Sequence, residues 1–568
     1  TGWCRENGIS PYMLFLGAYG ILLSSVSGKR EIMIGTPAAG RNHRELQEIC
    51  GPFINTMPLR IAVDKETEPL RYLQDVRQEV TGMLEHPDCS LEEMISMLGL
   101  PRSFSDNPLY QAAFSMRPFE TGKLELAGIP MEYVPVFTGT AKTELFIELV
   151  LEEEEFRLQF EYASSLFEED TVRLYGRSME SIVRALVDGG AETIGELPLM
   201  DVSDRMELFE IPNYRFMPYL NQPVHQMVRN RARMYPGETA VIYHGQRLTY
   251  RELEQMAGIV AGGLHEAGAA RGDRIGLCFA RTPWLLAGML GILKAGCAYV
   301  PLSPSLPEKR VRYILETAGA SIVLCDKENR VNMQGKTALP LLSSEELTAA
   351  PWEDTGINGE DLIHVLFTSG STGRPKGVIL RHRSLSNLFA NMKMLMASVT
   401  GPVLCTANMM FDIFIVESLF PLAMGNPVVM ADEEEMMLPW LLAGLIRDTG
   451  AQFVQMTASR LQMGNESFRE AAAGLKLVIA GGETLTESLA ESFRRVCAGT
   501  LLNMYGPTEA AVCTTVEEVV PGRRITIGVP LSNCRVYILD EDRNPVMPTA
   551  AGELYLAGEG ISEGYIGR

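Results

Sequence analysis

A loop rich in glycine and hydroxyl residues ends in a lysine within residues 366–378 (LFTSGSTGRPKGV). A β-branched run at residues 363–367 leads into this loop, and an apolar run follows it. Glycines let backbone N–H groups approach an anion closely, hydroxyls add donors, and a lysine adds a point charge. We therefore predict that the loop binds the phosphates of a nucleotide. The predicted binding residues are Thr368, Ser369, Gly370, Ser371, Thr372, Gly373 and Lys376.

This loop is not a Walker A loop. That motif, G-x-x-x-x-G-K-[ST], places its lysine between a glycine and a hydroxyl residue, whereas Lys376 follows Pro375 and precedes Gly377. A flexible serine–glycine linker is the alternative interpretation. We disfavour it because such linkers seldom end in P-K-G and continue into an apolar segment, as this loop does at residues 378–380.

The sequence T-S-G-S-T-G-x-P-K-G resembles the phosphate loop of the adenylate-forming enzymes. These are the adenylation domains of nonribosomal peptide synthetases, the acyl-CoA synthetases and the luciferases. Further family motifs match in the same order as in that superfamily. They are residues 248–253 (LTYREL), 293–302 (LKAGCAYVPL), 503–509 (NMYGPTE) and 552–568 (GELYLAGEGISEGYIGR). The resemblance covers residues 222–568.

The resemblance implies ATP and Mg²⁺ as ligands and assigns roles to motif residues. Tyr505 would stack on the adenine, Glu509 would hold Mg²⁺, and Thr508 would approach the α-phosphate. A single carboxylate together with substrate phosphates is a common way of holding magnesium. Lys376, Thr508 and Glu509 are then the catalytic residues. The other implied nucleotide contacts are Gly481, Gly482, Glu483, Asn503 and Gly506. The implied reaction is attack of a carboxylate on the α-phosphorus of ATP, with release of pyrophosphate.

One carboxylate points to the class of acid that is activated. Phe411–Asp412 stands where peptide synthetase domains carry an F-D pair whose aspartate binds the α-ammonium of an amino acid. A buried carboxylate without a partner is costly, so an amine-bearing substrate is favoured. The alternative for Asp412 is a helix N-cap. The family's pocket positions correspond to Asp412, Ile413, Val416, Gln455, Val478, Ala480, Met504, Val512 and Cys513. This set resembles pockets for large hydrophobic or aromatic side chains.

The first third of the chain has a resemblance of its own. Residues 34–60 and 108–116 are similar to segments of peptide synthetase condensation domains, in the C-terminal lobe of their chloramphenicol-acetyltransferase-like fold. The catalytic H-H-x-x-x-D-G motif of that family is absent, because no two of the seven histidines are adjacent. We therefore expect a condensation lobe at residues 1–188, a linker at 189–221, and the large adenylation subdomain at 222–568.

Periodicity and composition predict an α/β fold. Residues 169–186 read as an amphipathic helix, and after residue 221 helices alternate with β-branched runs at 321–325, 363–367 and 476–480. That alternation is typical of parallel sheets covered by helices. The resemblance adds αβα layered sheets and a small β-barrel to the large subdomain. Residues 9–28 carry no charge, and we favour a buried helix over a membrane span or a signal peptide.

The composition excludes some partners. The 568 residues carry a net charge of −21, which disfavours nucleic acid and anionic membranes as partners. The ten cysteines form no C-x-x-C pair and suit a reducing compartment, so we expect a cytoplasmic protein.

Together these features predict a central fragment of a nonribosomal peptide synthetase that activates an amino acid. An acyl-CoA or aryl-acid ligase is the alternative enzyme, and a non-catalytic nucleotide- or amino-acid-binding protein is the alternative of another class. The implied partners are carrier domains upstream and downstream, with phosphopantetheine on a carrier outside this chain. The small C-terminal adenylation subdomain, with its catalytic lysine, is also expected to lie beyond residue 568.

Overall fold

The computed structural model forms two compact units, which are described separately. Unit 1 comprises Thr1–Glu210 and Tyr537–Leu554, and unit 2 comprises Ile211–Val536 and Tyr555–Arg568. The structure describes residues 2–567 except 42–43, 87–88, 102–106, 118–123, 127–128, 132–135, 137–138, 153–154, 349–351, 353–355, 370–373 and 465.

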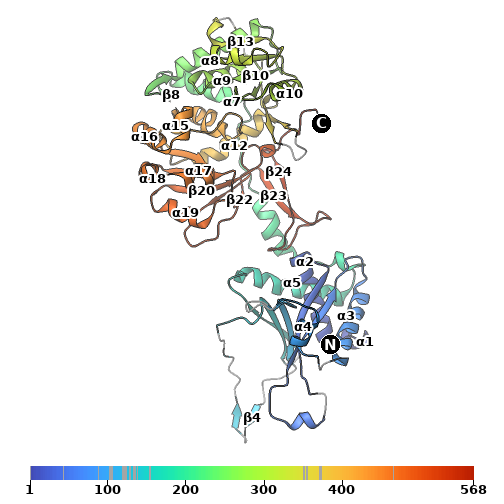
Figure 1. The fold of residues 1–568 in the computed structure, drawn as a ribbon. Coiled ribbons are helices and arrows are strands. Elements are labelled where there is room, and N and C mark those ends of the chain that lie inside the picture. The colour runs from blue at the N-terminus through green and yellow to red at the C-terminus, as the bar shows by residue number, and fades with distance from the viewer. Residues whose placement is uncertain are drawn as a thin grey trace. The chain divides into compact units, whose positions relative to one another are not determined.

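Unit 1 is built on a five-stranded sheet of order β2-β1-β3-β6-β7 (Figure 1). Its inner pairs β1–β3 and β3–β6 are parallel, and its outer pairs β1–β2 and β6–β7 are antiparallel. The strands are β1 (Glu31–Ala38), β2 (Asn55–Ala62), β3 (Ala112–Arg117), β6 (Leu145–Glu152) and β7 (Glu155–Tyr162), and β4 (Leu124–Leu126) pairs with β5 (Ile129–Met131) separately. The helices are α1 (Gly2–Glu6), α2 (Pro11–Ser27), α3 (Pro69–Glu85), α4 (Leu91–Met97), α5 (Glu169–Asp188) and α6 (Val202–Arg205).

The uncharged stretch near the N-terminus is the buried helix that the sequence predicts. The Ser10 hydroxyl accepts the N–H of Met13 at the start of α2, and Gly28 ends the helix at φ 69°. Residues 14–22 are all buried in the core of unit 1. Among the described residues, no helix is long and apolar enough to cross a membrane.

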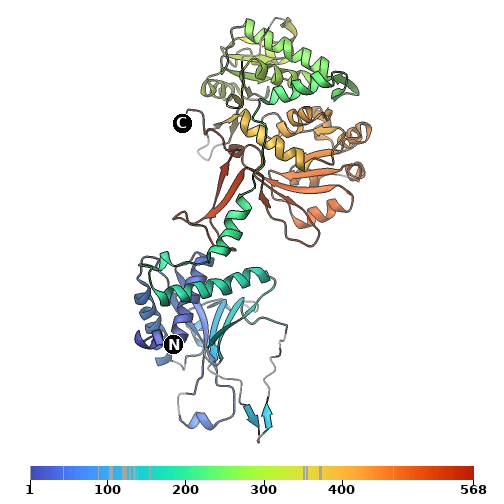
Figure 2. The ribbon, with the colours of Figure 1, turned by 180° about the vertical axis from the view of Figure 1, so that it is seen from behind.

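Helix α5 confirms the predicted amphipathic helix. It buries Val172, Leu174, Met179, Ile182 and Leu186, and it is the long teal helix that lies across the strands of unit 1 in Figure 2. The predicted linker begins where this helix ends, but residues 202–213 form short helical turns instead of irregular chain. A local hydrogen bond explains part of the difference, because the Asp201 side chain caps the first of these turns by accepting the N–H of Asp204. The boundary between the units falls inside these turns, after Glu210.

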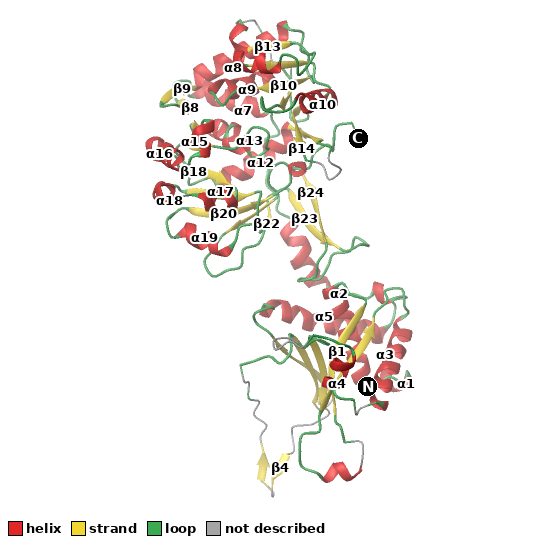
Figure 3. Ribbon diagram, in the orientation of Figure 1, coloured by secondary structure: helices red, strands yellow, loops and turns green. Residues whose placement is uncertain are grey.

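Unit 2 contains the predicted helix-covered parallel sheets, with strands and helices alternating along the chain (Figure 3). One sheet has the order β13-β12-β10-β11-β14-β15, and the other β22-β21-β20-β19-β18-β16-β17-β8-β9. Parallel pairs form the interior of both sheets. The predicted runs at 321–325, 363–367 and 476–480 correspond to β12, β14 and β19.

The strands of unit 2 are β8 (Thr239–Tyr243), β9 (Gln246–Thr249), β10 (Arg274–Cys278), β11 (Ala298–Pro301), β12 (Ile322–Cys325), β13 (Leu341–Ser343), β14 (Leu362–Thr368), β15 (Lys376–Arg381), β16 (Val403–Cys405), β17 (Val428–Met430), β18 (Phe453–Met456), β19 (Leu477–Gly481), β20 (Thr500–Tyr505), β21 (Thr515–Glu518) and β22 (Val529–Pro530). Strands β23 (Cys534–Leu539) and β24 (Glu553–Gly558) form a separate two-stranded sheet. In the part of the chain that the structure describes, the expected small β-barrel is therefore not seen as a closed sheet.

Helices of unit 2 follow most of these strands. They are α7 (Val224–Met234), α8 (Tyr250–Glu266), α9 (Pro283–Lys294), α10 (Glu308–Ala318), α11 (Lys327–Met333), α12 (His382–Leu395), α13 (Phe414–Glu417), α14 (Leu419–Met424), α15 (Glu433–Met437), α16 (Pro439–Thr449), α17 (Ala458–Met463), α18 (Glu466–Ala472) and α19 (Glu487–Arg494). Because the carboxyl ends of parallel strands meet at one edge of a sheet, the loops that follow β16, β18, β19 and β20 are brought together there.

Candidate functional site

The predicted phosphate loop connects two antiparallel strands, β14 and β15. Thr368 ends β14 and pairs in register with Lys376, the first residue of β15. The structure thus places both ends of the loop side by side. The predicted contacts Gly370, Ser371, Thr372 and Gly373 lie outside the described residues, so their role stays a prediction.

The lysine of this loop faces an aromatic ring from the far end of the chain. The Nζ atom of Lys376 lies 4.9 Å from the ring centroid of Tyr565, within the range of a cation–π interaction. The hydroxyl of Tyr565 also donates a hydrogen bond to Glu509 Oε1 at 2.7 Å. The predicted phosphate lysine and the predicted magnesium ligand therefore contact the same side chain.

The N-M-Y-G-P-T-E motif spans the end of β20 and the turn that follows it. Tyr505 is the last residue of β20 and keeps 38% of its surface exposed, whereas Asn503 is buried and donates to the carbonyl of Thr526 at 2.6 Å. A Cβ atom on Gly506 would lie 2.6 Å from Cα of Cys513, so only glycine fits this close approach. Part of Tyr505 is therefore accessible to a ligand, and its stacking on adenine stays a prediction.

The glycine turn after β19 is held by its own glutamate. Gly482 has φ 79°, and the Glu483 carboxylate accepts the N–H of Ser459 at 2.8 Å. Hydrogen bonds from Ser459 keep the pKa of Glu483 below its ordinary value. This carboxylate ties the Gly481–Glu483 turn to the start of α17, so its contact with adenine stays a prediction.

Asp412 lies beside the turn that carries the predicted magnesium ligand. Its Oδ1 accepts the N–H of Ile413 at 2.8 Å, and the Thr508 hydroxyl is a further hydrogen-bond partner. Burial raises the pKa of Asp412 above its ordinary value, because its surroundings disfavour an uncompensated carboxylate. Asp412 also lies at the start of α13, where its carbonyl accepts the N–H of Ile415 at 3.1 Å, but no side-chain cap of that helix is seen. Both interpretations of Asp412 therefore stay predictions.

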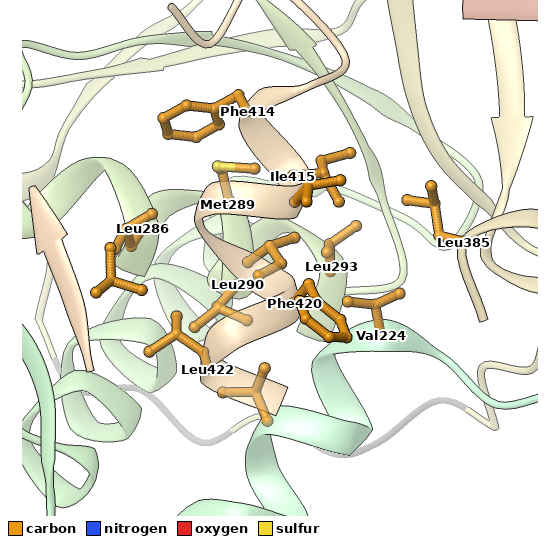
Figure 4. Close-up of a cluster of buried hydrophobic side chains, with 14 of the residues drawn as sticks. Val224, Leu286, Met289, Leu290, Leu293, Leu385, Phe414, Ile415, Phe420 and Leu422 are labelled. Atoms are coloured by element: carbon orange, nitrogen blue, oxygen red, sulfur yellow. The ribbon is translucent and has the colours of Figure 1, made fainter. Parts of the chain in front are cut away.

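Apolar packing fixes the position of Asp412. Figure 4 shows Phe414, Ile415, Phe420 and Leu422 of helices α13 and α14 among side chains of neighbouring helices. Those neighbours are Val224, Leu286, Met289, Leu290, Leu293 and Leu385. A dense core of this kind leaves the following helices little freedom to shift, which holds the preceding carboxylate in place.

The predicted substrate pocket is only partly gathered into one group. Ile413, Val416, Met504, Val512 and Cys513 belong to a single apolar cluster of unit 2. Val478 and Ala480 are fully buried in a second cluster, because alternate side chains of β19 point to opposite faces of the sheet. Gln455 is buried, and within the described residues its Oε1 atom has no hydrogen-bond partner.

A buried glutamate and an arginine near Asp412 have no role assigned from the sequence. Glu417 is 1% exposed and accepts the N–H groups of Thr406 and Ala407 at 2.6 and 2.7 Å. Burial raises the pKa of Glu417 to about 7. Arg281 donates to the carbonyls of Cys405 and Ala431, each at 2.8 Å.

These two residues fix the loops at the carboxyl ends of β16 and β17. The available signal for Glu417 is a single carboxylate inside the apolar run FIVESLF. Such a residue is seldom fully buried unless it has partners.

Comparison with known families places both halves of the chain. Residues 228–566 match the AMP-binding enzyme family, and residues 1–209 match the condensation domain family. The first match covers more than half of the chain and includes the loop, the β20 turn and Tyr565. The second covers most of unit 1.

Curated relatives match the whole chain but are much longer. Bacitracin synthase 3 of Bacillus licheniformis is 32% identical over 578 residues, which is 99% of this chain and 9% of that protein. Tyrocidine synthase 3 of Brevibacillus parabrevis is 31% identical over 576 residues, again 99% of this chain and 9% of that protein. The chain therefore spans about a tenth of the length of these relatives.

Solved structures agree with these assignments. Holo-AB3403, a four-domain nonribosomal peptide synthetase bound to AMP and glycine, has a TM-score of 0.89 and 26% identity; the match covers 100% of this chain and 44% of that one. The N-terminal subdomain of NpsA from Klebsiella oxytoca, in complex with 3-hydroxyanthranilyl-AMSN, has a TM-score of 0.55 and 24% identity, over 61% of this chain and 88% of that one. The second likeness is one of fold.

Proposed function

Because this chain belongs to the nonribosomal peptide synthetase family, with a condensation domain followed by an AMP-binding domain, we propose that it activates an amino acid as its adenylate. A carboxylate oxygen of the amino acid attacks the α-phosphorus of ATP. A bond forms between that oxygen and the α-phosphorus, and the phosphoanhydride bond between the α- and β-phosphates breaks. Pyrophosphate leaves with the electron pair of that bond. The site contributes mainly orientation and charge compensation to such a reaction.

The observation that carries the proposal is the contact between Asp412 and Thr508. Burial raises the pKa of the Asp412 carboxyl, so a cationic partner such as the ammonium of an amino acid would stabilise its ionised form. Thr508 joins it to the turn that carries Glu509. The groups that would hold the ammonium and the polyphosphate are thus a single hydrogen bond apart.

The residues present fit a magnesium ion and a nucleotide. Glu509 offers carboxylate oxygen, the donor that this hard cation prefers, and Lys376 offers a positive charge to phosphate oxygens. When bound, Mg²⁺ would neutralise phosphate charge. Tyr505 would provide a stacking face for adenine, and the Oε1 atom of Gln455 is a buried acceptor that a ligand donor could satisfy.

We propose a large apolar or aromatic amino acid as the substrate. Ile413, Val416, Met504, Val512 and Cys513 form the apolar group beside Asp412 that supports this choice. Gln455, Val478 and Ala480 complete the proposed pocket.

The proposal extends to the context of the reaction. The adenylate would be transferred to phosphopantetheine on a carrier domain, and the condensation domain would receive carrier domains from upstream and downstream. We place the reaction in the cytoplasm. All ten cysteines are unpaired in the structure, which supports a reducing compartment.

Acid-dependent ATP–pyrophosphate exchange tests the proposal. The chain, joined to its natural flanking sequence, is screened against the twenty proteinogenic amino acids together with aryl and fatty acids. We expect exchange with a large apolar or aromatic amino acid. Exchange with acids that lack an amine would favour an acyl-CoA or aryl-acid ligase instead, and binding of ATP without any exchange would favour a non-catalytic binding protein.

The role of Asp412 is tested with matched substrates. Asp412→Ala should reduce exchange more for the preferred amino acid than for its deamino analogue, because the lost partner is an ammonium. Asp432→Ala, at the N-cap of α15, is the control carboxylate and should affect both substrates equally. Equal losses for the two acids in Asp412→Ala would contradict the ammonium-binding role.

A further inference from the structure

The last described residues of the chain add a short strand to β15. The N–H of Ile379 donates to the carbonyl of Gly564 at 3.1 Å, and the N–H of Ile566 donates to the carbonyl of Gly377 at 2.8 Å. Glu563 also forms an ion pair with Arg381 at 2.6 Å. These contacts fix the backbone of Tyr565 opposite Val378, two residues after the phosphate-loop lysine.

The same segment is tied to the turn that carries Glu509. The N–H of Ser562 donates to the backbone carbonyl of Glu509 at 2.8 Å, and the Tyr565 hydroxyl donates to the Glu509 carboxylate at 2.7 Å. The ring of Tyr565 meanwhile faces Lys376 at 4.9 Å. Three segments that are distant in sequence therefore meet at one half-buried tyrosine.

We propose that Tyr565 is a positioning residue that holds Glu509 and Lys376 apart and correctly oriented for a magnesium–polyphosphate ligand. The inference rests on the proposed function and adds a residue to its site. Tyr565 acts through the two charged side chains and takes no proton from the substrate. Its hydroxyl fixes one oxygen of the carboxylate, which leaves the other oxygen for the cation.

The physical reason for a tyrosine here is that Lys376 and Glu509 have opposite charges. A direct ion pair between them would occupy both groups, and a phosphate or a cation would have to break it. Among the described residues, no ion pair joins these two side chains. The hydroxyl of Tyr565 donates a hydrogen bond to the Glu509 carboxylate, and its ring face contacts the Lys376 ammonium. Because neither charge is neutralised by these contacts, both remain available to a ligand.

A purely structural role for Tyr565 would affect stability and leave the metal dependence of nucleotide binding unchanged. A group that orients a metal ligand instead changes the affinity for the metal, commonly by tenfold or more. The two roles are therefore separated by measuring binding as a function of Mg²⁺ concentration.

The experiment compares Tyr565→Phe with Tyr219→Phe. Tyr219 is the matched control because its hydroxyl donates to Glu559 at 2.9 Å, which is the same kind of bond elsewhere in unit 2. Binding of a non-hydrolysable ATP analogue is measured by calorimetry over a series of Mg²⁺ concentrations, and AMP binding and thermal unfolding are measured alongside.

We expect Tyr565→Phe to raise the Mg²⁺ concentration for half-maximal binding about tenfold, while AMP affinity and the unfolding temperature stay near those of the wild type. Tyr219→Phe should leave all these values unchanged.

Tyr565→Leu removes the ring as well as the hydroxyl. It should weaken binding of the ATP analogue in the absence of Mg²⁺, whereas Tyr565→Phe should preserve that binding. In a double-mutant cycle, Tyr565→Phe should cause no further change in the Mg²⁺ dependence of binding when Glu509→Gln is already present.

The outcomes separate this inference from the proposed function. An unchanged Mg²⁺ dependence in Tyr565→Phe, or full additivity with Glu509→Gln, would overturn the positioning role while leaving adenylation intact. A wild-type chain that binds no nucleotide at any Mg²⁺ concentration would overturn both.

Discussion

The two units differ in what they bury. The buried polar and charged side chains of unit 1 are Thr36, Ser115, Ser178 and Asp204. Asp204 is the member of this set that carries a full charge, whereas the described residues of unit 2 bury several groups that can ionise near neutral pH or carry a full charge. They are His225, Lys294, His364, His382 and Glu417.

Sheet topology explains part of this difference. The outer strands of unit 1 are antiparallel, and its core is closed mainly by apolar helix faces. Unit 2 is largely parallel, so many loops converge at the carboxyl ends of its strands, and their backbone groups need partners. Glu417 and Arg281 supply such partners at the carboxyl ends of β16 and β17. Costly buried charge is thus concentrated in the unit that carries the candidate site.

The largest expected effect tests this contrast with one buried carboxylate from each unit. Glu417→Ala leaves two buried N–H groups and nearby arginines without their anion, and should destabilise unit 2 by about 3–5 kcal/mol. Asp204→Ala in unit 1 should cost about 2 kcal/mol, because its partner Arg177 is half exposed. Denaturant titration with hydrogen exchange assigns each loss to a unit. Equal losses would break the comparison.

A smaller effect sharpens the contrast between ligand binding and stability. Tyr505→Ala should weaken ATP binding by about 1–3 kcal/mol through loss of base stacking. Unfolding of unit 2 should change little, because the ring is 38% exposed. Calorimetry and denaturant titration on the same variant measure both quantities. An unchanged ATP affinity would contradict the stacking role.

The third prediction concerns pH. Burial lowers the pKa of His364 to about 3, so this side chain is neutral in the folded state while the unfolded chain takes up a proton below about pH 6.5. Its contribution to stability is therefore present above pH 6.5 and falls as the pH is lowered towards 3. Between pH 6.5 and 5 the loss should be about 1.5 kcal/mol.

The His364→Gln variant isolates that contribution. Subtracting its unfolding free energy from that of the wild type at each pH removes the opposing effect of Glu417. The pKa of Glu417, raised to about 7, makes its contribution decrease as the pH rises from about 4.5 to 7. A difference that does not vary with pH would show that His364 is not buried in its neutral form.

The smallest effect belongs to unit 1. The buried hydroxyl of Tyr175 donates to the carbonyl of Pro548 at 3.1 Å and contacts the hydroxyl of Thr549. Tyr175→Phe should cost about 1 kcal/mol of unfolding free energy and leave ATP affinity unchanged. Tyr505→Ala is expected to do the reverse, because it should weaken ATP binding more than it lowers stability. A loss of ATP affinity in Tyr175→Phe would therefore contradict the assignment of nucleotide binding to unit 2.

Much of the fold was predictable because its signals are local. The amphipathic stretch of α5, the uncharged helix α2 and the β-branched runs of β12, β14 and β19 each appear within a few turns or a few residues of sequence. Motifs such as N-M-Y-G-P-T-E are equally contiguous. The helical turns at residues 202–213 were missed, because the proline and turn formers of this stretch predict irregular chain.

The predicted pocket shows where such reasoning ends. Met504 and Ala480 are close to motif glycines, yet they belong to different apolar clusters. Alternation along a strand decides which face each side chain meets, and the pairing of β19 with β20 decides their neighbours. The residues of the motif specify neither the face that a side chain occupies nor the pairing of β19 with β20.

The sequence alone determined which chemistry we predict for this protein, because the predicted phosphate loop and the predicted magnesium-binding turn each consist of neighbouring residues. Only the tertiary structure decided how those groups are held. Tyr565 meets Glu509 across 56 residues of chain and reaches Lys376 from yet farther, through a strand added to β15. Asp412, just before α13, likewise meets Thr508, just after β20, across a long stretch of chain. Contacts between distant segments depend on strand order and packing, which no local pattern encodes.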